Sequence, residues 1–157
     1  MTVVRKPIIA VVGAGKCSKK LKDMAAEIGK YVAEQGGIIV CGGLEGVMEG
    51  AARGAKEAGG TTIGILPTMD KNDANEFIDY VIPTGFGEAR NIIVVRTADA
   101  VIALPGKYGT LSEMAFALQA KKPLISVSAW KLGEDMLQID DPIEAAKMAM
   151  KLARGDE

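Results

Sequence analysis

Residues 98–120 read ADAVIALPGKYGTLSEMAFALQA and change character twice. Ala98–Leu104 is a nearly continuous apolar run, of the length and composition typical of a strand buried on both faces. Pro105–Gly109 (PGKYG) interrupts this run, and Thr110–Ala120 is predicted to be a helix. The stretch therefore predicts one strand–loop–helix unit of an α/β protein.

The same alternation extends in both directions along the chain. Short apolar runs predict strands, and longer segments with apolar residues at helical spacing predict helices. The predicted strands are Pro7–Val12, Ile38–Cys41, Thr61–Leu66, Tyr80–Ile82 and Pro123–Val127. The predicted helices are Ser18–Gln35, Gly46–Ala58, Gly87–Thr97 and a C-terminal helix capped by Asp141, while Pro67–Phe77 is predicted to be a loop. We expect one α/β domain over residues 1–157, with a parallel sheet between two helical layers.

Composition excludes several classes of function. The 157 residues include 19 basic and 20 acidic side chains, so the net charge of -1 favours no nucleic-acid partner. The chain has no histidine, which excludes Ser-His-Asp and Cys-His catalysis and every histidine-ligated metal site. Cys17 and Cys41 form no CxxC pair, so we predict no metal site and a reducing, cytoplasmic setting. The apolar runs are too short for a bilayer, so no membrane partner is expected.

Three predicted strand-to-helix junctions are rich in glycine. They contain Gly13 and Gly15, Gly42 and Gly43, and Gly106 and Gly109. Glycine lets a ligand approach the backbone, and the helix that follows offers free N–H groups, so such junctions favour phosphate. The alternative is that each is only a tight turn. Neither GxGxxG nor GxxxxGK[ST] is present, which argues against ordinary NAD binding and P-loop ATP hydrolysis. Lys16 is interpreted as a solvated loop lysine that could also reach a phosphate.

Two charged residues complete the predicted site. Arg90 falls near the start of a predicted helix, where a cation is disfavoured unless an anion lies there too. The alternative is a surface arginine paired with Glu88 or another carboxylate. Glu113 is a candidate acid or base, but Thr110-Leu111-Ser112-Glu113 also matches a helix capping box with Thr110 as N-cap.

These residues resemble a known family. Pro105–Glu113 resembles the PGGxGTxxE motif of the Lonely Guy (LOG) family and its wider Rossmann-like superfamily (SLOG), and Gly42–Met48 resembles the family's GGxxGxM segment. Arg90 precedes Pro105 by fifteen residues, as the family's arginine does. The stretch 83–91 is more similar to a small branch that resembles molybdenum cofactor carrier proteins. The resemblance implies a single-domain Rossmann-like three-layer sandwich.

The resemblance also implies a function. LOG enzymes hydrolyse cytokinin nucleoside 5′-monophosphates, with an arginine and a glutamate that correspond to Arg90 and Glu113; carrier-like relatives bind a phosphorylated pterin. Lys107 stands where the enzyme motif has glycine, so we expect a carrier or sensor of a phosphorylated ligand first, a phosphoribohydrolase second, and an assembly protein with a vestigial cleft third. No cofactor is required, although molybdenum cofactor is a candidate cargo, and a homodimer or homotetramer is expected. The expected ligand contacts come from Gly13, Gly15, Gly42, Gly43, Arg90, Gly106, Lys107, Gly109 and Thr110.

Overall fold

The computed structural model describes residues 3–156. The strands are β1 (Ile8–Val12), β2 (Ile38–Cys41), β3 (Thr61–Leu66), β4 (Tyr80–Pro83), β5 (Ala100–Ala103), β6 (Leu124–Ser126) and β7 (Leu137–Gln138). The α-helices are α1 (Lys19–Glu34), α2 (Val47–Glu57), α3 (Arg90–Thr97), α4 (Tyr108–Gln119) and α5 (Pro142–Ala153). Two short 3-10 helices, η1 (Lys71–Asp73) and η2 (Gly87–Ala89), lie in the segments before β4 and α3.

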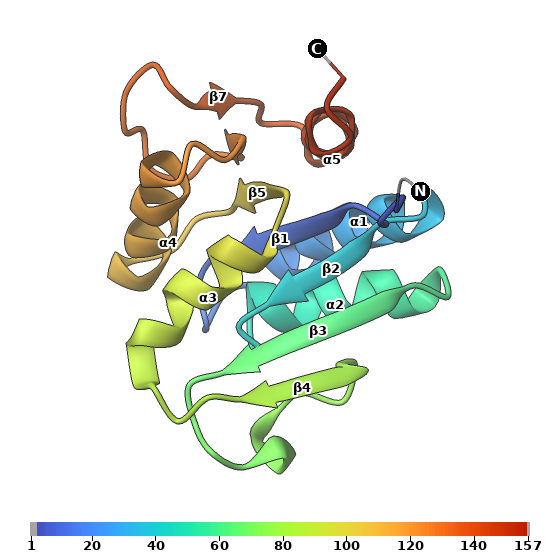
Figure 1. Ribbon diagram of the computed structural model, residues 1–157, viewed down its shortest axis with the longest axis vertical. Helices are drawn as coiled ribbons and strands as arrows, with labels where there is room; N and C mark the ends of the chain where they lie inside the picture. The colour runs from blue at the N-terminus through green and yellow to red at the C-terminus, as the bar shows by residue number, and fades with distance from the viewer. Residues whose placement is uncertain (1–2, 157) are drawn as a thin grey trace.

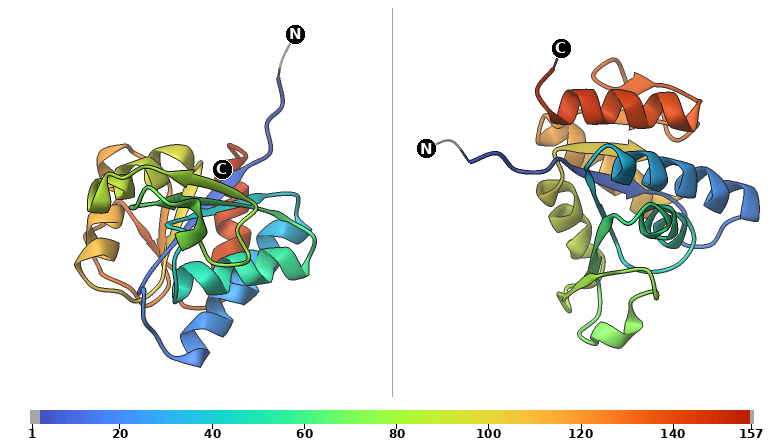
Figure 2. Two further views of the ribbon diagram at one scale, coloured as in Figure 1. Left: turned by 90° about the horizontal axis from the view of Figure 1, so that it is seen from below. Right: turned by 90° about the vertical axis from the view of Figure 1, so that its right-hand side faces the viewer.

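One seven-stranded sheet runs through the molecule in the order β4-β3-β2-β1-β5-β6-β7, and every neighbouring pair is parallel. Helices α1, α2 and α5 cover one face, while α3 and α4 cover the other (Figures 1 and 2). The predicted Rossmann-like α/β sandwich with a parallel sheet is thus confirmed.

Successive residues of the central strands point to opposite faces of the sheet, and apolar residues on both faces explain why both are covered by helices. Ile9 and Val11 of β1 join the core under α1, α2 and α5, whereas Ala10 and Val12 join the core under α3 and α4. Strand β5 divides in the same way, and all four of its residues are fully buried. A strand buried on both sides has no polar positions, which is why the sequence shows it as an uninterrupted apolar run.

The order of the strands places the glycine-rich junctions together. The chain builds β1 to β4 outward on one side and then crosses back to place β5 beside β1 on the other side. The loops after β1 and β5 therefore lie at a reversal of strand order, where open α/β sheets form their binding crevice.

Several details differ from the predicted elements. The predicted helix Gly87–Thr97 is divided into η2 and α3, and the predicted loop Pro67–Phe77 contains η1. Strand β7 was not predicted, because its two residues are both exposed and carry no apolar run. The predicted cap of α5 is confirmed, since the Asp141 carboxylate accepts a hydrogen bond from the Glu144 N–H at 2.9 Å. No helix in the described part of the chain is long and apolar enough to cross a membrane.

Candidate functional site

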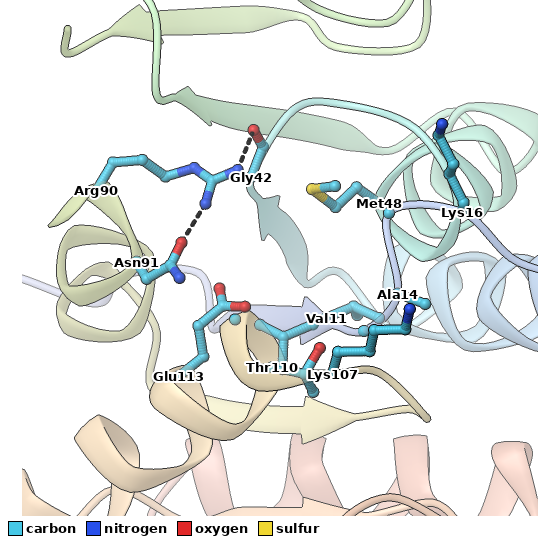
Figure 3. A pocket seen from close by; sticks show the side chains of 14 residues that line it. Val11, Ala14, Lys16, Gly42, Met48, Arg90, Asn91, Lys107, Thr110 and Glu113 are labelled. Carbon is cyan, nitrogen blue, oxygen red and sulfur yellow. Dashed lines mark hydrogen bonds between the residues drawn. The ribbon is translucent and has the colours of Figure 1, made fainter. Parts of the chain in front are cut away.

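Backbone hydrogen bonds join the three glycine-rich junctions into one wall. The Ala14 N–H donates to the Pro105 carbonyl at 2.9 Å, and the Val47 N–H donates to the Ala14 carbonyl at 3.0 Å. The loop after β1 is thereby held between the loop after β5 and the start of α2. The loops enclose a cavity of about 380 Å³ at the carboxyl ends of the strands (Figure 3). Its lining consists of Val11, Val12, Gly13, Ala14, Gly15, Lys16, Gly42, Met48, Arg90, Asn91, Lys107, Gly109, Thr110 and Glu113.

The structure separates the predicted glycines into two groups. Gly13, Gly15, Gly42 and Gly109 line the cavity, together with the other predicted site residues. Gly43 and Gly106 do not belong to this lining. Gly43 has a φ of +79°, which favours glycine for the turn itself, and its carbonyl accepts the Asn75 N–H at 2.9 Å.

Two of the lining glycines have no structural reason to be glycine within the protein. A Cβ on Gly15 would have Met48 Cε at 3.9 Å as its nearest neighbour, and a Cβ on Gly109 would have Asn91 Nδ2 at 3.8 Å. Neither residue has a positive φ. A side chain would therefore fit the protein at both positions but would project into space that a ligand could use. This pattern is what close approach of a ligand to the backbone requires.

Helix α4 begins at this cavity without a side-chain cap. Its N-cap is Lys107, and among residues 3–156 no side chain accepts a hydrogen bond from the N–H groups of the first turn. The capping-box interpretation of Thr110 and Glu113 is therefore wrong, because Thr110 lies inside the helix. Lys107 has a φ of -101°, so the backbone accommodates a lysine where the LOG motif has glycine. Uncapped N–H groups at the positive end of a helix dipole favour an anion.

Glu113 projects one turn further along α4 into the same cavity (Figure 3). The residue is only 8% exposed, and its carboxyl group forms no hydrogen bond or ion pair within residues 3–156. Burial raises the pKa of Glu113 to about 8, although the charge of Arg90 opposes this effect. At neutral pH most of this carboxyl is protonated, so it can donate a hydrogen bond or a proton to a ligand.

Arg90 is the first residue of α3 and is held by main-chain oxygens. Its Nε donates to the Ile65 carbonyl at 2.9 Å and its Nη2 to the Gly42 carbonyl at 3.5 Å. Its Nη1 also donates to the Asn91 side-chain oxygen (Figure 3). No ion pair joins it to Glu88 or to any other carboxylate in the part of the chain that the structure describes, so the interpretation as a paired surface arginine is wrong. Burial lowers the pKa of Arg90 below its usual value and the Glu113 carboxylate opposes this, but an arginine remains charged at neutral pH.

Asn91 connects Arg90 with the start of α4 and was not among the predicted site residues. It is 3% exposed, and its amide nitrogen donates to the Ser112 hydroxyl at 3.2 Å. That hydroxyl donates in turn to the Gly109 carbonyl at 2.7 Å. The contiguous motif Glu88–Asn91 could have signalled this role, since a buried asparagine requires partners for its amide.

A family model described as SLOG cluster4 family matches residues 6–152. The chain belongs to this family. The resemblance inferred from the Pro105–Glu113 and Gly42–Met48 motifs is thereby confirmed.

Solved structures and a curated enzyme are similar to this SLOG protein. The molybdenum cofactor binding protein from the phototrophic bacterium Rippkaea orientalis is 36% identical, with a TM-score of 0.86 over 95% of this chain and 98% of the other. The Moco carrier protein from Chlamydomonas reinhardtii is 37% identical, with a TM-score of 0.85 over 96% of this chain and 99% of the other. A cytokinin riboside 5′-monophosphate phosphoribohydrolase from Mycobacterium tuberculosis is 32% identical over 120 residues, which are 71% of this chain and 64% of that enzyme.

The cavity of this SLOG protein carries a positive balance of charge. Lys16 and Lys107 both line it with exposed side chains, and Arg90 lies on the opposite wall (Figure 3). Glu113 is the one acidic residue of the lining, and its raised pKa leaves it mostly neutral. Lys16, interpreted from the sequence as a solvated loop lysine, is thus both solvated and placed at the cavity. The charges favour an anionic ligand.

The two cysteines of this SLOG protein lie outside the lining of the cavity. Cys41 is fully buried beside the site, and burial raises the pKa of its thiol to about 12. Burial also raises the pKa of Cys17, and neither thiol lines the cavity. Within residues 3–156, no three His, Cys, Asp or Glu side chains are grouped so that they could hold a metal ion.

Proposed function

We propose that this pocket binds a phosphorylated heterocyclic ligand and that the protein carries this ligand without converting it. The ligand classes are molybdenum cofactor, which is a pterin phosphate, and nucleoside monophosphates. The observation that carries the proposal is the convergence of bare backbone at Gly15 and Gly109 with the uncapped N-terminus of α4. The oxygens of a phosphoryl group can accept several hydrogen bonds from N–H groups at once, so a phosphoryl group fits this arrangement.

The two ends of the cavity suit different parts of such a ligand. Phosphate would lie against the glycine loops, within reach of the Lys16 and Lys107 ammonium groups. The ring would lie toward Arg90, Asn91 and Glu113, whose polar groups can donate hydrogen bonds. The similarity to the molybdenum cofactor binding protein and the Moco carrier protein supports the pterin phosphate as cargo.

Native mass spectrometry of freshly purified protein tests this proposal most directly. A co-purified pterin phosphate or nucleotide would identify the ligand class, and adding it back should raise the melting temperature. If neither nucleoside monophosphates nor pterin phosphates raise the melting temperature, the proposed binding function is wrong. The result would favour an assembly protein with a vestigial cleft instead.

A second candidate, phosphoribohydrolase activity, is favoured by one observation. Glu113 is a buried carboxyl with a pKa of about 8 in the same cavity as Arg90, which is the setting of a general acid. The similar enzyme from M. tuberculosis supports this candidate, although the match spans 64% of its length. Incubation with AMP and cytokinin monophosphates, followed by chromatography for free base, separates the two functions. Base release that disappears in Glu113→Gln would replace the carrier function with the enzymatic one.

A further inference from the structure

The main-chain carbonyl of Lys107 accepts two hydrogen bonds. One comes from the Leu111 N–H at 3.0 Å and opens the hydrogen-bond ladder of α4. The other comes from the indole Nε1 of Trp130 at 3.2 Å. Trp130 lies 23 residues further along the chain, in the loop after β6, and does not line the cavity. The Trp130 side chain, which lies outside the pocket, therefore holds the first peptide of α4, the helix that begins at the pocket.

Trp130 is itself fixed to the sheet. Ser126, the last residue of β6, is 1% exposed, and its hydroxyl donates to the Trp130 carbonyl at 3.2 Å. The same hydroxyl accepts the Ala129 N–H at 3.0 Å. Trp130 is 38% exposed as a residue, so it is partly open to solvent while its N–H is held by the Lys107 carbonyl. A continuous set of contacts thus runs from β6 through Ser126 and Trp130 to the start of α4.

Because the peptide bond is planar, the contact between Trp130 and Lys107 also sets the direction of the next N–H group. The Lys107 carbonyl and the Tyr108 N–H belong to one planar trans peptide and point in opposite directions. Holding the carbonyl oxygen therefore also fixes where the Tyr108 N–H points. The next N–H groups, from Gly109 and Thr110, follow within the same helical turn and belong to residues that line the cavity. Hydrogen bonds to an anion weaken steeply when donors are misaligned.

We propose that Trp130 is a positioning residue for phosphate: its indole N–H holds the first turn of α4 so that the free N–H groups of this turn converge on the phosphoryl group. The inference rests on the proposed binding function. It does not rest on the helix end alone. Glu113 lines the same cavity, is only 8% exposed and has no hydrogen-bond partner within residues 3–156, so its carboxyl group independently indicates a ligand there.

A single atomic change tests the proposal. Trp130 is the only tryptophan in the sequence, so residue-specific incorporation of benzothienylalanine replaces only its N–H with sulfur and preserves the shape of the ring. Inorganic phosphate is the probe, followed through the backbone amide resonances of Gly109 and Thr110. Loss of one hydrogen bond should weaken phosphate binding by about three- to tenfold. Trp130→Phe should act in the same direction, while Tyr80→Phe, a change at a 65% exposed side chain on β4, should not.

A comparison of AMP with adenosine separates positioning from a general loss of structure. A positioning role weakens AMP binding and leaves adenosine binding unchanged, so the ratio of the two affinities falls. Equal weakening of both ligands, together with a lower melting temperature, would overturn the proposal. Unchanged phosphate affinity in the analogue would also overturn it while leaving the proposed function intact. If phosphate and phosphorylated ligands fail to bind the unmodified protein at all, both the proposed function and this inference are wrong.

Discussion

Gly106 and Thr110 are in direct contact across the first turn of α4. A Cβ on Gly106 would lie 2.0 Å from the Thr110 hydroxyl oxygen and 3.0 Å from the Ala14 nitrogen. Three residues further along, a Cβ on Gly109 would meet nothing closer than 3.8 Å. Glycine is therefore required by packing at Gly106, whereas at Gly109 the protein itself leaves the space open.

Alanine substitutions should separate these two roles. Gly106→Ala should destabilise the protein by about 1–3 kcal/mol, because overpacking forces side chains and backbone to move. Gly109→Ala should change stability by less than about 1 kcal/mol, since alanine favours a helix, yet it should abolish most phosphate or AMP binding. Urea unfolding and calorimetric titration measure the two quantities. Full ligand affinity in Gly109→Ala would contradict the proposed position of the phosphate.

Glu113 should make the protein less stable as the pH rises. Its folded pKa of about 8 lies above the usual value of 4.5, so the folded state binds the additional proton between these two values. Stability is then greatest below the unfolded pKa and falls as the pH rises toward 8, by a total on the order of a few kcal/mol. Glu113→Gln removes this titration. The difference in unfolding free energy between variant and parent should therefore shift in favour of the variant from pH 5 to pH 8.

The control for this prediction is Glu134→Gln, which changes an exposed carboxylate that does not line the cavity. Its unfolding free energy relative to the parent should stay constant over the same range. A Glu113→Gln difference that is equally flat with pH would mean that the carboxyl is ionised in the folded protein. The site would then present a negative charge, and the case for an anionic ligand would weaken.

The sequence was sufficient for the central strands of the sheet, because these strands are buried on both faces and so appear as pure apolar runs. The glycine junctions were predicted because parallel strands bring their carboxyl ends to one edge. Arg90 was singled out by its place near the start of a helix, and Glu113 by its place in the Pro105–Glu113 motif. The order of the outer strands and the role of Trp130 could not be predicted, because the contact between Trp130 and Lys107 depends on the path of a loop. The capping-box error has a similar cause: Thr110 matches the local pattern, but helix α4 begins earlier, at Tyr108.

Arg90 should be irreplaceable by lysine despite the equal charge. Its Nε and terminal nitrogens reach the Ile65 carbonyl and the Asn91 side chain together, which one ammonium group cannot do. Arg90→Lys should reduce stability by about 1–3 kcal/mol and weaken AMP binding by about tenfold. Arg96→Lys, at an exposed position in the last turn of the same helix, is the matched control. Equal behaviour of the two variants in urea unfolding and in titration would show that the guanidinium geometry is unimportant.

Substitution of Lys107 tests whether the protein carries or cleaves its ligand. Lys107→Gly restores the glycine of the LOG motif, removes one ammonium group from the cavity and frees the backbone at the N-cap of α4. If the protein is a carrier, the variant should bind phosphate several-fold more weakly, lose up to about 1 kcal/mol of stability through backbone entropy, and still release no free base from AMP. Lys6→Gly, at an exposed lysine before β1 and outside the cavity lining, controls for the loss of charge and the gain of flexibility. Release of free base by Lys107→Gly alone would mean that the catalytic groups Arg90 and Glu113 are intact and that this lysine is what suppresses hydrolysis, which would contradict a site built only for binding.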